Sequence, residues 1–488
     1  MATKLSLSSL PSLPANVRKP AYGRGDLSPG IVHVGVGNFH RAHQAVYLHR
    51  LFETGRDRDW AIVGAGVKPY DAAMRAKLED QDWLTTVVEL DPKGFSATVT
   101  GSMIDFAEVD PARLIDTIAR PEIRIVSLTV TEGGYYVDAK TGGFDAGHPE
   151  IVADRENTGD PKTVFGILIA ALMKRRDAGL PPFTVMSCDN LPENGHVARR
   201  AVLGLAEYWP AGTRTWIAEN VAFPCGMVDC ITPATGPREI GIVRDTFGIE
   251  DAAPVVCEPF RQWVLEDHFP QGRPALEAVG VEFVRDVAPY ELMKLRILNG
   301  GHATIAYPAG LLGIHFVHDA MRHPLVTGFL EKLEFSEIIP TVPEIPGVSR
   351  EAYYRKIVER FSNEAVGDTI PRLCLDGSNR QPKFILPTIA ARLDAGQSVD
   401  GLALEVALWC RYCAASDENG NPIAIDDIAA ERLTAQALAA RADPSAWLSM
   451  HDIFADLGGN AVFSSAFARA LSALWRDGVT ATLEAYLA

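Results

Sequence analysis

Short apolar runs alternate with helical stretches along the first part of the chain. Seven runs rich in β-branched residues predict strands, at residues 31–35, 60–64, 84–90, 97–103, 123–131, 183–190 and 281–287. From Pro289 onward apolar residues recur at helical spacing, which predicts helices at 324–335, 350–361, 386–393, 401–413, 425–440 and 461–475. We therefore expect an α/β domain over residues 1–286 and a mostly α-helical domain over residues 287–488.

The first predicted strand runs directly into a glycine turn. Gly35-Val-Gly37 is followed by Asn38, Phe39 and a predicted helix that continues to about Gly55. Strand, glycine turn and helix together are typical of a Rossmann-like dinucleotide-binding domain, in which the backbone approaches a pyrophosphate. His40 stands where that fingerprint has its third glycine.

Polar residues follow several of the predicted strands. Asp71 comes after the second strand, where this fold places its contact to the adenosine ribose; the alternative is a cap of the next helix. Glu132 precedes two glycines after the strand at 123–131, and Asn190 ends the strand at 183–190. Because ligands bind beyond the carboxyl ends of parallel strands, both residues are candidates for a site.

One apolar helix carries three polar side chains, Lys294, Asn299 and His302. At about 100° per residue they share an arc of about 140°. Burial lowers the pKa of a lysine toward the range of a proton acceptor, while Asn and His supply donors for a developing oxyanion or a hydroxyl. The alternative is that Lys294 extends to the surface and the other two are satisfied core residues.

Charge and cysteine content narrow the classes of partner. The formal net charge of -16 over 488 residues argues against binding nucleic acid or an anionic membrane surface. We find no signal peptide and no apolar run long enough to span a membrane. Seven cysteines, an odd number, indicate free thiols and a cytoplasmic location. The pair Cys410 and Cys413 lies in an apolar helical run, so structural thiols are favoured over a metal site.

Arg372 and Arg380 fall in an expected loop between helices. Two arginines beside a cleft suit sugar hydroxyls or a carboxylate; the alternative is plain surface charge.

Over nearly its whole length the chain resembles the long-chain polyol-specific dehydrogenases. The matching motifs are Gly35–Gln44, Thr131–Tyr135, Val185–Pro192, Met227–Asp229, Cys257–Phe260, Gln262–Asp267, Lys294…Asn299-Gly-x-His302, Asp376–Ser378 and Pro382–Phe384. Two departures stand at Cys230, often arginine in that family, and at Arg380, usually lysine. Tyr70 occupies a position where a second acid can occur.

The resemblance implies roles for individual residues. Lys294 corresponds to the general base, Asn190 and Asn299 to the residues that bind the reacting oxygen, and Glu132 to the proton route to solvent. His302, Arg372, Arg380 and Asp229 correspond to residues on the substrate and nicotinamide side. The implied cofactor contacts are Gly35, Gly37, Asn38, Phe39, Asp71, Val228 and Asp229, with Asp71 favouring NAD, and no metal takes part.

We therefore expect a monomeric, metal-independent enzyme that uses NAD to oxidise a linear polyol to a ketose. D-Mannitol and D-fructose are the expected pair. A D-arabinitol 4-dehydrogenase or a mannonate/fructuronate oxidoreductase is the enzymatic alternative, since a carboxylate substrate would suit Arg372 and Arg380. A non-catalytic protein that binds NAD or a sugar is the alternative from another class.

Overall fold

The computed structural model describes residues 2–138 and 141–488. The chain forms two compact units, Met1–Ala288 and Pro289–Ala488. None of the helices in the described residues is long and apolar enough to cross a membrane.

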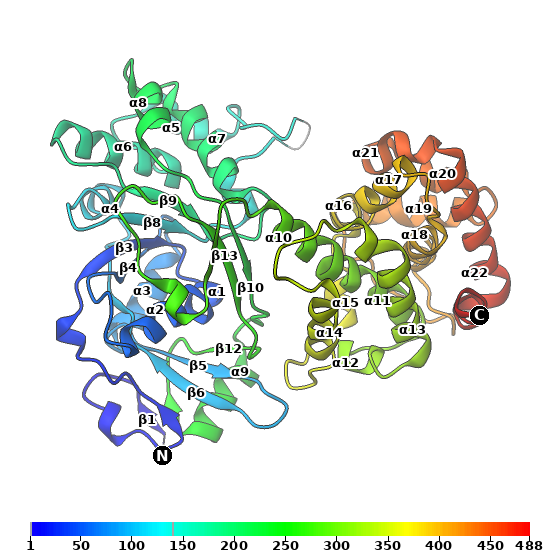
Figure 1. Cartoon of the computed structure of the whole chain (residues 1–488), viewed down its shortest axis with the longest axis horizontal. Helices are drawn as coiled ribbons and strands as arrows, with labels where there is room; N and C mark the ends of the chain where they lie inside the picture. Colours follow the sequence, from blue (N-terminus) through cyan, green and yellow to red (C-terminus); the bar gives the residue numbers. More distant parts are fainter. Residues whose placement is uncertain (1, 139–140) are drawn as a thin grey trace. The chain divides into compact units, whose positions relative to one another are not determined.

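The N-terminal unit is built on a five-stranded sheet (Figure 1). All its neighbouring strands are parallel, in the order β7 (Met103–Phe106), β4 (Ala61–Ala65), β3 (Pro29–Val34), β8 (Ile125–Leu128) and β9 (Thr184–Ser187). β3, the first of these five strands along the chain, is thus central, and the strand order reverses between β3 and β8. This is the Rossmann arrangement, in which ligands bind at the point of reversal, and the predicted fold class is confirmed.

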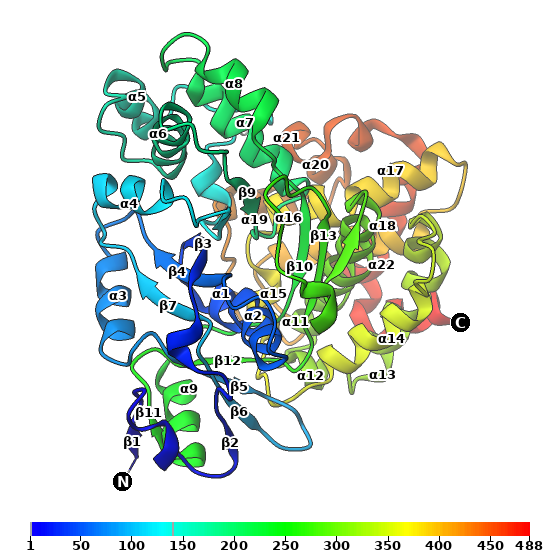
Figure 2. The same cartoon turned by 60° about the vertical axis from the view of Figure 1, so that its left-hand side comes forward.

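Helices cover both faces of the sheet (Figure 2), and alternate residues of its strands belong to the cores on opposite faces. Val32, Val63 and Val126 pack toward α4 (Pro111–Ile118), α6 (Val164–Asp177) and α7 (Asn194–Ala206). Ile31 and Ile62 pack toward α2 (Gln44–Glu53) and α3 (Asp71–Glu79). Both faces of the sheet are therefore covered, which explains why the strands read as nearly continuous apolar runs.

Smaller sheets complete the N-terminal unit. One contains β12 (Val255–Cys257), β5 (Thr85–Glu89), β6 (Ser96–Thr100) and β2 (Val17–Arg18), another β10 (Gly226–Asp229), β13 (Gln262–Glu266) and β14 (Glu282–Val284), and a third β1 (Thr3–Lys4) and β11 (Ile249–Glu250). The other helices are α1 (Asn38–Ala42), α5 (Pro149–Glu156), α8 (Thr213–Asn220) and α9 (Pro237–Gly241), the short turns η1 (Leu10–Ser12), η2 (Arg24–Asp26), η3 (Glu132–Tyr135) and η5 (Leu276–Val279), and the π-turn η4 (Ile242–Thr246).

Two sequence predictions in this unit were wrong. The strand expected at 97–103 is two strands in different sheets, β6 and β7, because the Ser102 hydroxyl between them donates to the carbonyl of Ala45 at 2.7 Å. The helix expected to run on to Gly55 breaks at His43, whose backbone is non-helical. The His43 ring bonds the carbonyl of Gln262 at 2.9 Å, so a contact far along the chain holds the break.

The C-terminal unit is helical. Its α-helices are α10 (Ala288–Met293, which begins one residue before the unit), α11 (Gly300–Leu311), α12 (Val317–Ala320), α13 (Pro324–Leu333), α14 (Arg350–Phe361), α15 (Ile370–Cys374), α16 (Gly377–Phe384), α17 (Leu386–Asp394), α18 (Asp400–Cys413), α19 (Ala430–Ala440), α20 (Ser445–Leu448), α21 (His451–Phe454) and α22 (Ala461–Leu487). The turns η6 (Lys294–Asn299) and η7 (Glu334–Ile338) are π-helical, and η8 (Ile339–Thr341) and η9 (Ala455–Gly459) are 3-10 turns.

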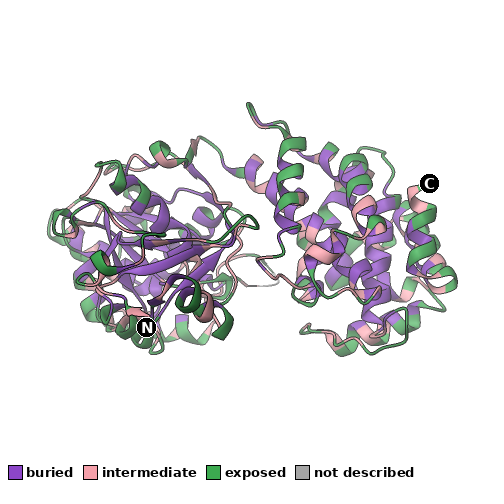
Figure 3. Cartoon of the chain, turned by 90° about the horizontal axis from the view of Figure 1, so that it is seen from below, coloured by how far each residue is buried: buried purple, intermediate pink, exposed green. Residues whose placement is uncertain are grey.

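In the core of this unit, α18 is buried from Gly401 to Cys413, and the buried residues of the unit lie mainly on the inward faces of its helices (Figure 3). Trp409 on α18 packs edge-on against Trp447, with ring centroids 4.8 Å apart. The helix expected at 425–440 starts only at Ala430, because the carboxylate of Asp427 bonds the backbone amide and hydroxyl of Ser378. The last helix continues beyond the predicted end at 475, through a kink at Gly478.

Glu405 on α18 is fully buried. One of its carboxylate oxygens accepts a hydrogen bond from the Gln381 amide at 2.7 Å, and burial raises the pKa of Glu405 to about 8. The folded-state pKa therefore lies above the unfolded one, so the stability that the neutral carboxyl contributes is lost as the pH rises toward 8.

We predict that Glu405→Gln gains stability relative to wild type as the pH rises from 5 to 8. The gain should be on the order of 3 kcal/mol, because an amide stays neutral and still accepts the Gln381 bond. Thermal unfolding midpoints of both proteins across this pH range measure the difference. Glu484→Gln, at an exposed position of α22, is the control and should show no such trend; a flat difference for Glu405→Gln would contradict the prediction.

Candidate functional site

The glycine turn follows β3 at the point where the strand order reverses. Gly35 has φ +97°, and a Cβ there would lie 2.1 Å from the Thr129 carbonyl oxygen, so only glycine fits against the neighbouring strand end. A Cβ at Gly37 would meet nothing closer than 3.9 Å. Glycine at position 37 is therefore not required by packing within the chain, and the space beside it leaves the backbone open to a ligand.

His40, which replaces the third glycine, belongs to the packing beneath this turn. Its ring stacks on His33 with centroids 3.4 Å apart, and both residues are buried. His33 in turn bonds the hydroxyls of Ser127 at 2.8 Å and Thr129 at 2.9 Å. Burial lowers the pKa of His33 to about 3 and that of His40 well below its ordinary value, so both rings stay neutral.

The side chains of Asn38 and Phe39 hold α1 in place. Asn38 donates to the Thr235 hydroxyl at 3.0 Å and accepts from Arg41 at 2.7 Å. Phe39 stacks on His43 with centroids 4.9 Å apart. The bond from Asn38 to Thr235 fixes the start of α1 against a segment that comes much later in the chain, and the other two contacts are local.

Asp71 lies where the fold would bring a ribose. Its carboxylate accepts the backbone amide of Lys68 at 2.9 Å, and a Cβ at Gly66 would lie 2.2 Å from its own Cβ, so a glycine makes room for it. Asp71 is the first residue of α3 and Tyr70 is the cap residue, without a capping bond; the alternative of a capping Asp71 is therefore wrong. The Lys68 ammonium bonds Glu150 at 2.6 Å, which lowers the pKa of that carboxyl.

A buried carboxylate, Asp189, organises the two polar strand ends. Its oxygens accept the amides of Val130 and Thr131, each at 2.9 Å, and the Tyr135 hydroxyl at 2.7 Å. Asp189 thereby fixes the loop that presents Glu132, and it directly precedes Asn190. Sequence reasoning missed Asp189, although its position inside a polar strand end was a signal.

Asn194 ties the end of β9 to the start of β10. Its amide donates to the carbonyls of Asp189 at 3.0 Å and Gly226 at 2.7 Å, and its oxygen accepts the Gly226 amide at 2.9 Å. Asn190 lies at one end of this clamp. At the other end β10 carries the buried residues Val228 and Asp229. The clamp was not predicted, because no local pattern marks it.

In the C-terminal unit, Lys294 lies in a π-turn and not in an α-helix. Residues Lys294–Asn299 form η6, between α10 and α11. In a π-turn the amide of one residue bonds the carbonyl five residues earlier. A π-turn winds by a smaller angle per residue than an α-helix, so Lys294 and Asn299 are closer around the helix axis than the separation of about 140° expected for an α-helix. Lys294 is 8% exposed.

His302, one turn further, stacks on Phe361 with centroids 4.1 Å apart. Nearby, Asp368 receives two hydrogen bonds from the guanidinium of Arg372. The hydrogen bond to Asp368 raises the pKa of Arg372. Asp368 was missed in the sequence, where its spacing of four residues from Arg372 was the signal.

Arg372 and Arg380 lie on α15 and α16, not in the loop that was expected. Arg380 donates to the carbonyl of Arg372 at 3.3 Å, so the structure brings the two arginines together. The motif Asp376–Ser378 is largely structural. A Cβ at Gly377 would lie 2.6 Å from the Trp409 ring nitrogen, and Ser378 bonds Asp427.

None of the seven cysteines is in a disulfide bond, and all are buried. No group of three or more His, Cys, Asp or Glu side chains suited to a metal ion occurs in residues 2–138 and 141–488.

Comparison with protein-family models gives two matches. Residues 29–278 match the mannitol dehydrogenase Rossmann domain. Residues 286–475 match the mannitol dehydrogenase C-terminal domain.

Curated relatives and solved structures match over almost the full length. A mannitol 2-dehydrogenase from Cereibacter sphaeroides is 56% identical over 475 residues, which is 97% of this chain and 99% of the relative. The Pseudomonas fluorescens mannitol 2-dehydrogenase, solved as a ternary complex with NAD and D-mannitol, superimposes with a TM-score of 0.88 at 44% identity, covering 99% of each chain. A D-sorbitol dehydrogenase in substrate-free form gives a TM-score of 0.91 at 35% identity, covering 98% of this chain and 100% of the other.

Proposed function

Because this chain belongs to the mannitol dehydrogenase family, we propose that it catalyses the NAD-dependent interconversion of D-mannitol and D-fructose. The observation that carries the proposal is the buried Lys294 in the same π-turn as Asn299, an arrangement suited to moving a proton from a hydroxyl. The 56% identity to a mannitol 2-dehydrogenase supports the choice of substrate.

The chain fits a dinucleotide. Gly35 and Gly37 form the turn at the reversal of strand order, and the open space beside Gly37 suits a pyrophosphate. Asp71 would accept bonds from the adenosine ribose, and Asn38, Phe39, Val228 and Asp229 would line the remainder. The bound nicotinamide supplies the hydride acceptor.

In this mechanism Lys294 removes the proton from the hydroxyl that is oxidised. Asn190 and Asn299 donate to the oxygen as negative charge develops on it, and His302 orients the substrate. Glu132, exposed on the loop held by Asp189, passes the proton on to solvent. The reaction uses lysine as acid and base and needs no metal ion.

A polyol fits the two arginines better than a sugar acid. The guanidinium of Arg372 is already paired with Asp368, so it presents hydrogen-bond donors without an uncompensated charge for a carboxylate. Arg380 would contact the far hydroxyls, in place of the lysine usual in the family. The paired guanidinium of Arg372 therefore disfavours mannonate as a substrate. D-Arabinitol and D-sorbitol are the polyols to compare with D-mannitol, and D-sorbitol is included because a D-sorbitol dehydrogenase is among the similar structures.

We expect NADH formation with D-mannitol, and its reverse with D-fructose, at a higher kcat/KM than with D-arabinitol, D-sorbitol or D-mannonate. Absorbance of NADH with each substrate at equal concentration measures the order. D-Arabinitol or D-sorbitol at the head of the series would reassign the substrate. No turnover with any of them would favour the non-catalytic alternative.

Lys294→Ala should lose about 10² to 10⁴ in rate in both directions, since one group serves as base and acid. In the wild type, polyol oxidation should rise with pH as the amine deprotonates, and ketose reduction should favour lower pH. Steady-state rates across pH, with NADH binding followed by fluorescence, check this.

Lys332→Ala, at an exposed lysine of the same unit, is the matched control and should behave as wild type. EDTA should leave the wild type active. A Lys294→Ala enzyme with a normal rate and pH profile, or inhibition by EDTA that zinc reverses, would refute the lysine mechanism.

NAD should be preferred over NADP, because a 2′-phosphate beside Asp71 meets a like charge. Asp71→Ala should narrow the preference for NAD over NADP by about 10-fold or more. The double variant Asp71→Ala with Glu150→Gln should narrow it further, since Lys68 loses its carboxylate partner and its ammonium can pair with the 2′-phosphate. The ratio of kcat/KM values for the two cofactors measures the effect. Glu150→Gln alone should keep the preference; equal use of both cofactors by the wild type would show that Asp71 is misassigned.

A further inference from the structure

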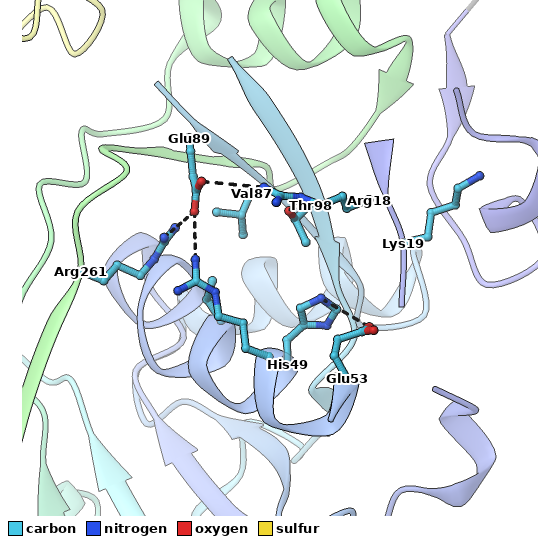
Figure 4. Close-up of a pocket in the computed structure, with 10 residues that line it drawn as sticks. Arg18, Lys19, His49, Glu53, Val87, Glu89, Thr98 and Arg261 are labelled. Carbon is cyan, nitrogen blue, oxygen red and sulfur yellow. Dashed lines mark hydrogen bonds and ion pairs between the residues drawn. The ribbon is translucent and has the colours of Figure 1, made fainter. Parts of the chain in front are cut away.

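A pocket of about 400 Å³ opens on the N-terminal unit, apart from the glycine turn (Figure 4). It lies between the far half of α2 and the sheet that contains β2, β5 and β6. Glu53, one of its lining residues, is nine residues beyond Gln44, which is about 14 Å along the helix axis. None of the proposed cofactor or substrate residues lines it.

The pocket is cationic although the chain is strongly acidic. Four cationic side chains, Arg18, Lys19, Arg50 and Arg261, face two carboxylates, Glu53 and Glu89, which leaves an excess of two positive charges. The whole chain carries a formal net charge of -16. The pocket is therefore a locally positive region on a protein whose overall charge is negative.

Three arginines converge on the single carboxylate of Glu89. Arg261 lies 2.6 Å from it, Arg50 3.2 Å and Arg18 3.8 Å, and Figure 4 shows Arg18 and Arg261 reaching it from opposite sides. Glu89 cannot compensate all three charges.

The titratable neighbours respond to this positive field. The pKa of His49 is lowered to about 4, by burial first and then by the charges of Arg50 and Arg18. The pKa of Arg50 is also lowered, by burial first and then by Arg261. His49 is thus neutral and bonds the Tyr22 hydroxyl at 2.9 Å, so it does not add to the charge.

We propose that this pocket binds a phosphate dianion, either free or as the monoester of a sugar. Planar guanidinium groups match the oxygens of phosphate in pairs, and two uncompensated positive charges match its charge. The volume is in the range of small-molecule pockets, so a hexose attached to the phosphate is also accommodated.

The pocket has a direct connection to α1. Arg261 is almost fully buried, and besides Glu89 it donates to the Ala42 carbonyl at 2.6 Å and to the Cys257 sulfur at 3.0 Å. Ala42 is the last residue of α1, the helix that follows the glycine turn. An anion that draws Arg261 away from Glu89 therefore acts on the end of that helix. The binding site itself does not depend on the proposed reaction.

Isothermal titration calorimetry with inorganic phosphate and with D-fructose 6-phosphate, at ionic strength held constant with sodium chloride, tests the proposal without any assay of turnover. Arg50→Gln should weaken binding of both about 10-fold or more, since it removes a charge-assisted bond. Glu89→Gln should strengthen binding by a similar factor, because it removes the competing carboxylate. Equal affinity for the two probes identifies the phosphate group alone as the ligand, and tighter binding of the ester identifies a sugar phosphate.

Arg58→Gln is the matched control, since Arg58 is also a surface arginine paired with a carboxylate, Asp26, and does not line the pocket. It changes the net charge as Arg50→Gln does and should bind both probes as the wild type does. Circular dichroism confirms that each variant is folded. The proposal is overturned if the wild type binds neither probe. It is also overturned if Arg50→Gln and Glu89→Gln change the affinity in the same direction, or if neither changes it more than Arg58→Gln does.

Discussion

The helical register at Lys294 is the constraint on which the proposed chemistry depends. A buried amine is costly in an apolar helix, and an α-helical register would hold Asn299 well around the axis from it. The π-turn η6 reduces that separation, because it winds by a smaller angle per residue. Glycines follow immediately, and a Cβ at Gly301 would lie 3.2 Å from a carboxylate oxygen of Glu334, so the helix packs closely on its neighbour.

Glu334 shows the cost of this packing. It is fully buried, burial raises its pKa well above the ordinary value, and neither carboxylate oxygen has a hydrogen-bond partner among the described residues. It belongs to a second π-turn, η7, beside the first. A second irregular turn with a neutral buried acid thus packs against the turn that contains the proposed base, which is the pattern expected where function is retained at the expense of stability.

The N-terminal unit achieves its precision with polar clamps. Asp189 and Asn194 are buried and bond backbone groups of several strand ends. Such bonds fix the backbone next to Glu132, Asn190 and Asp229. Two residues outside the proposed chemistry thereby hold the backbone that carries candidate site residues.

The sequence alone determined the features that rest on local contacts. The strand before Gly35, the glycine turn and the polar residues on an otherwise apolar helix were all readable, because each depends on neighbours a few residues away. The sequence also yielded the Rossmann-like fold class, since alternating strands and helices admit few arrangements.

Only the tertiary structure decided the features that depend on distant partners. It split the run at 97–103 between two sheets, broke the first helix at His43, and placed Arg372 and Arg380 on helices where a loop was expected. It also set the π-register of Lys294, which an α-helical period cannot predict. In each case a partner remote along the chain, or the packing of a whole helix, outweighed the local preference, and such contacts leave no periodic trace in the sequence.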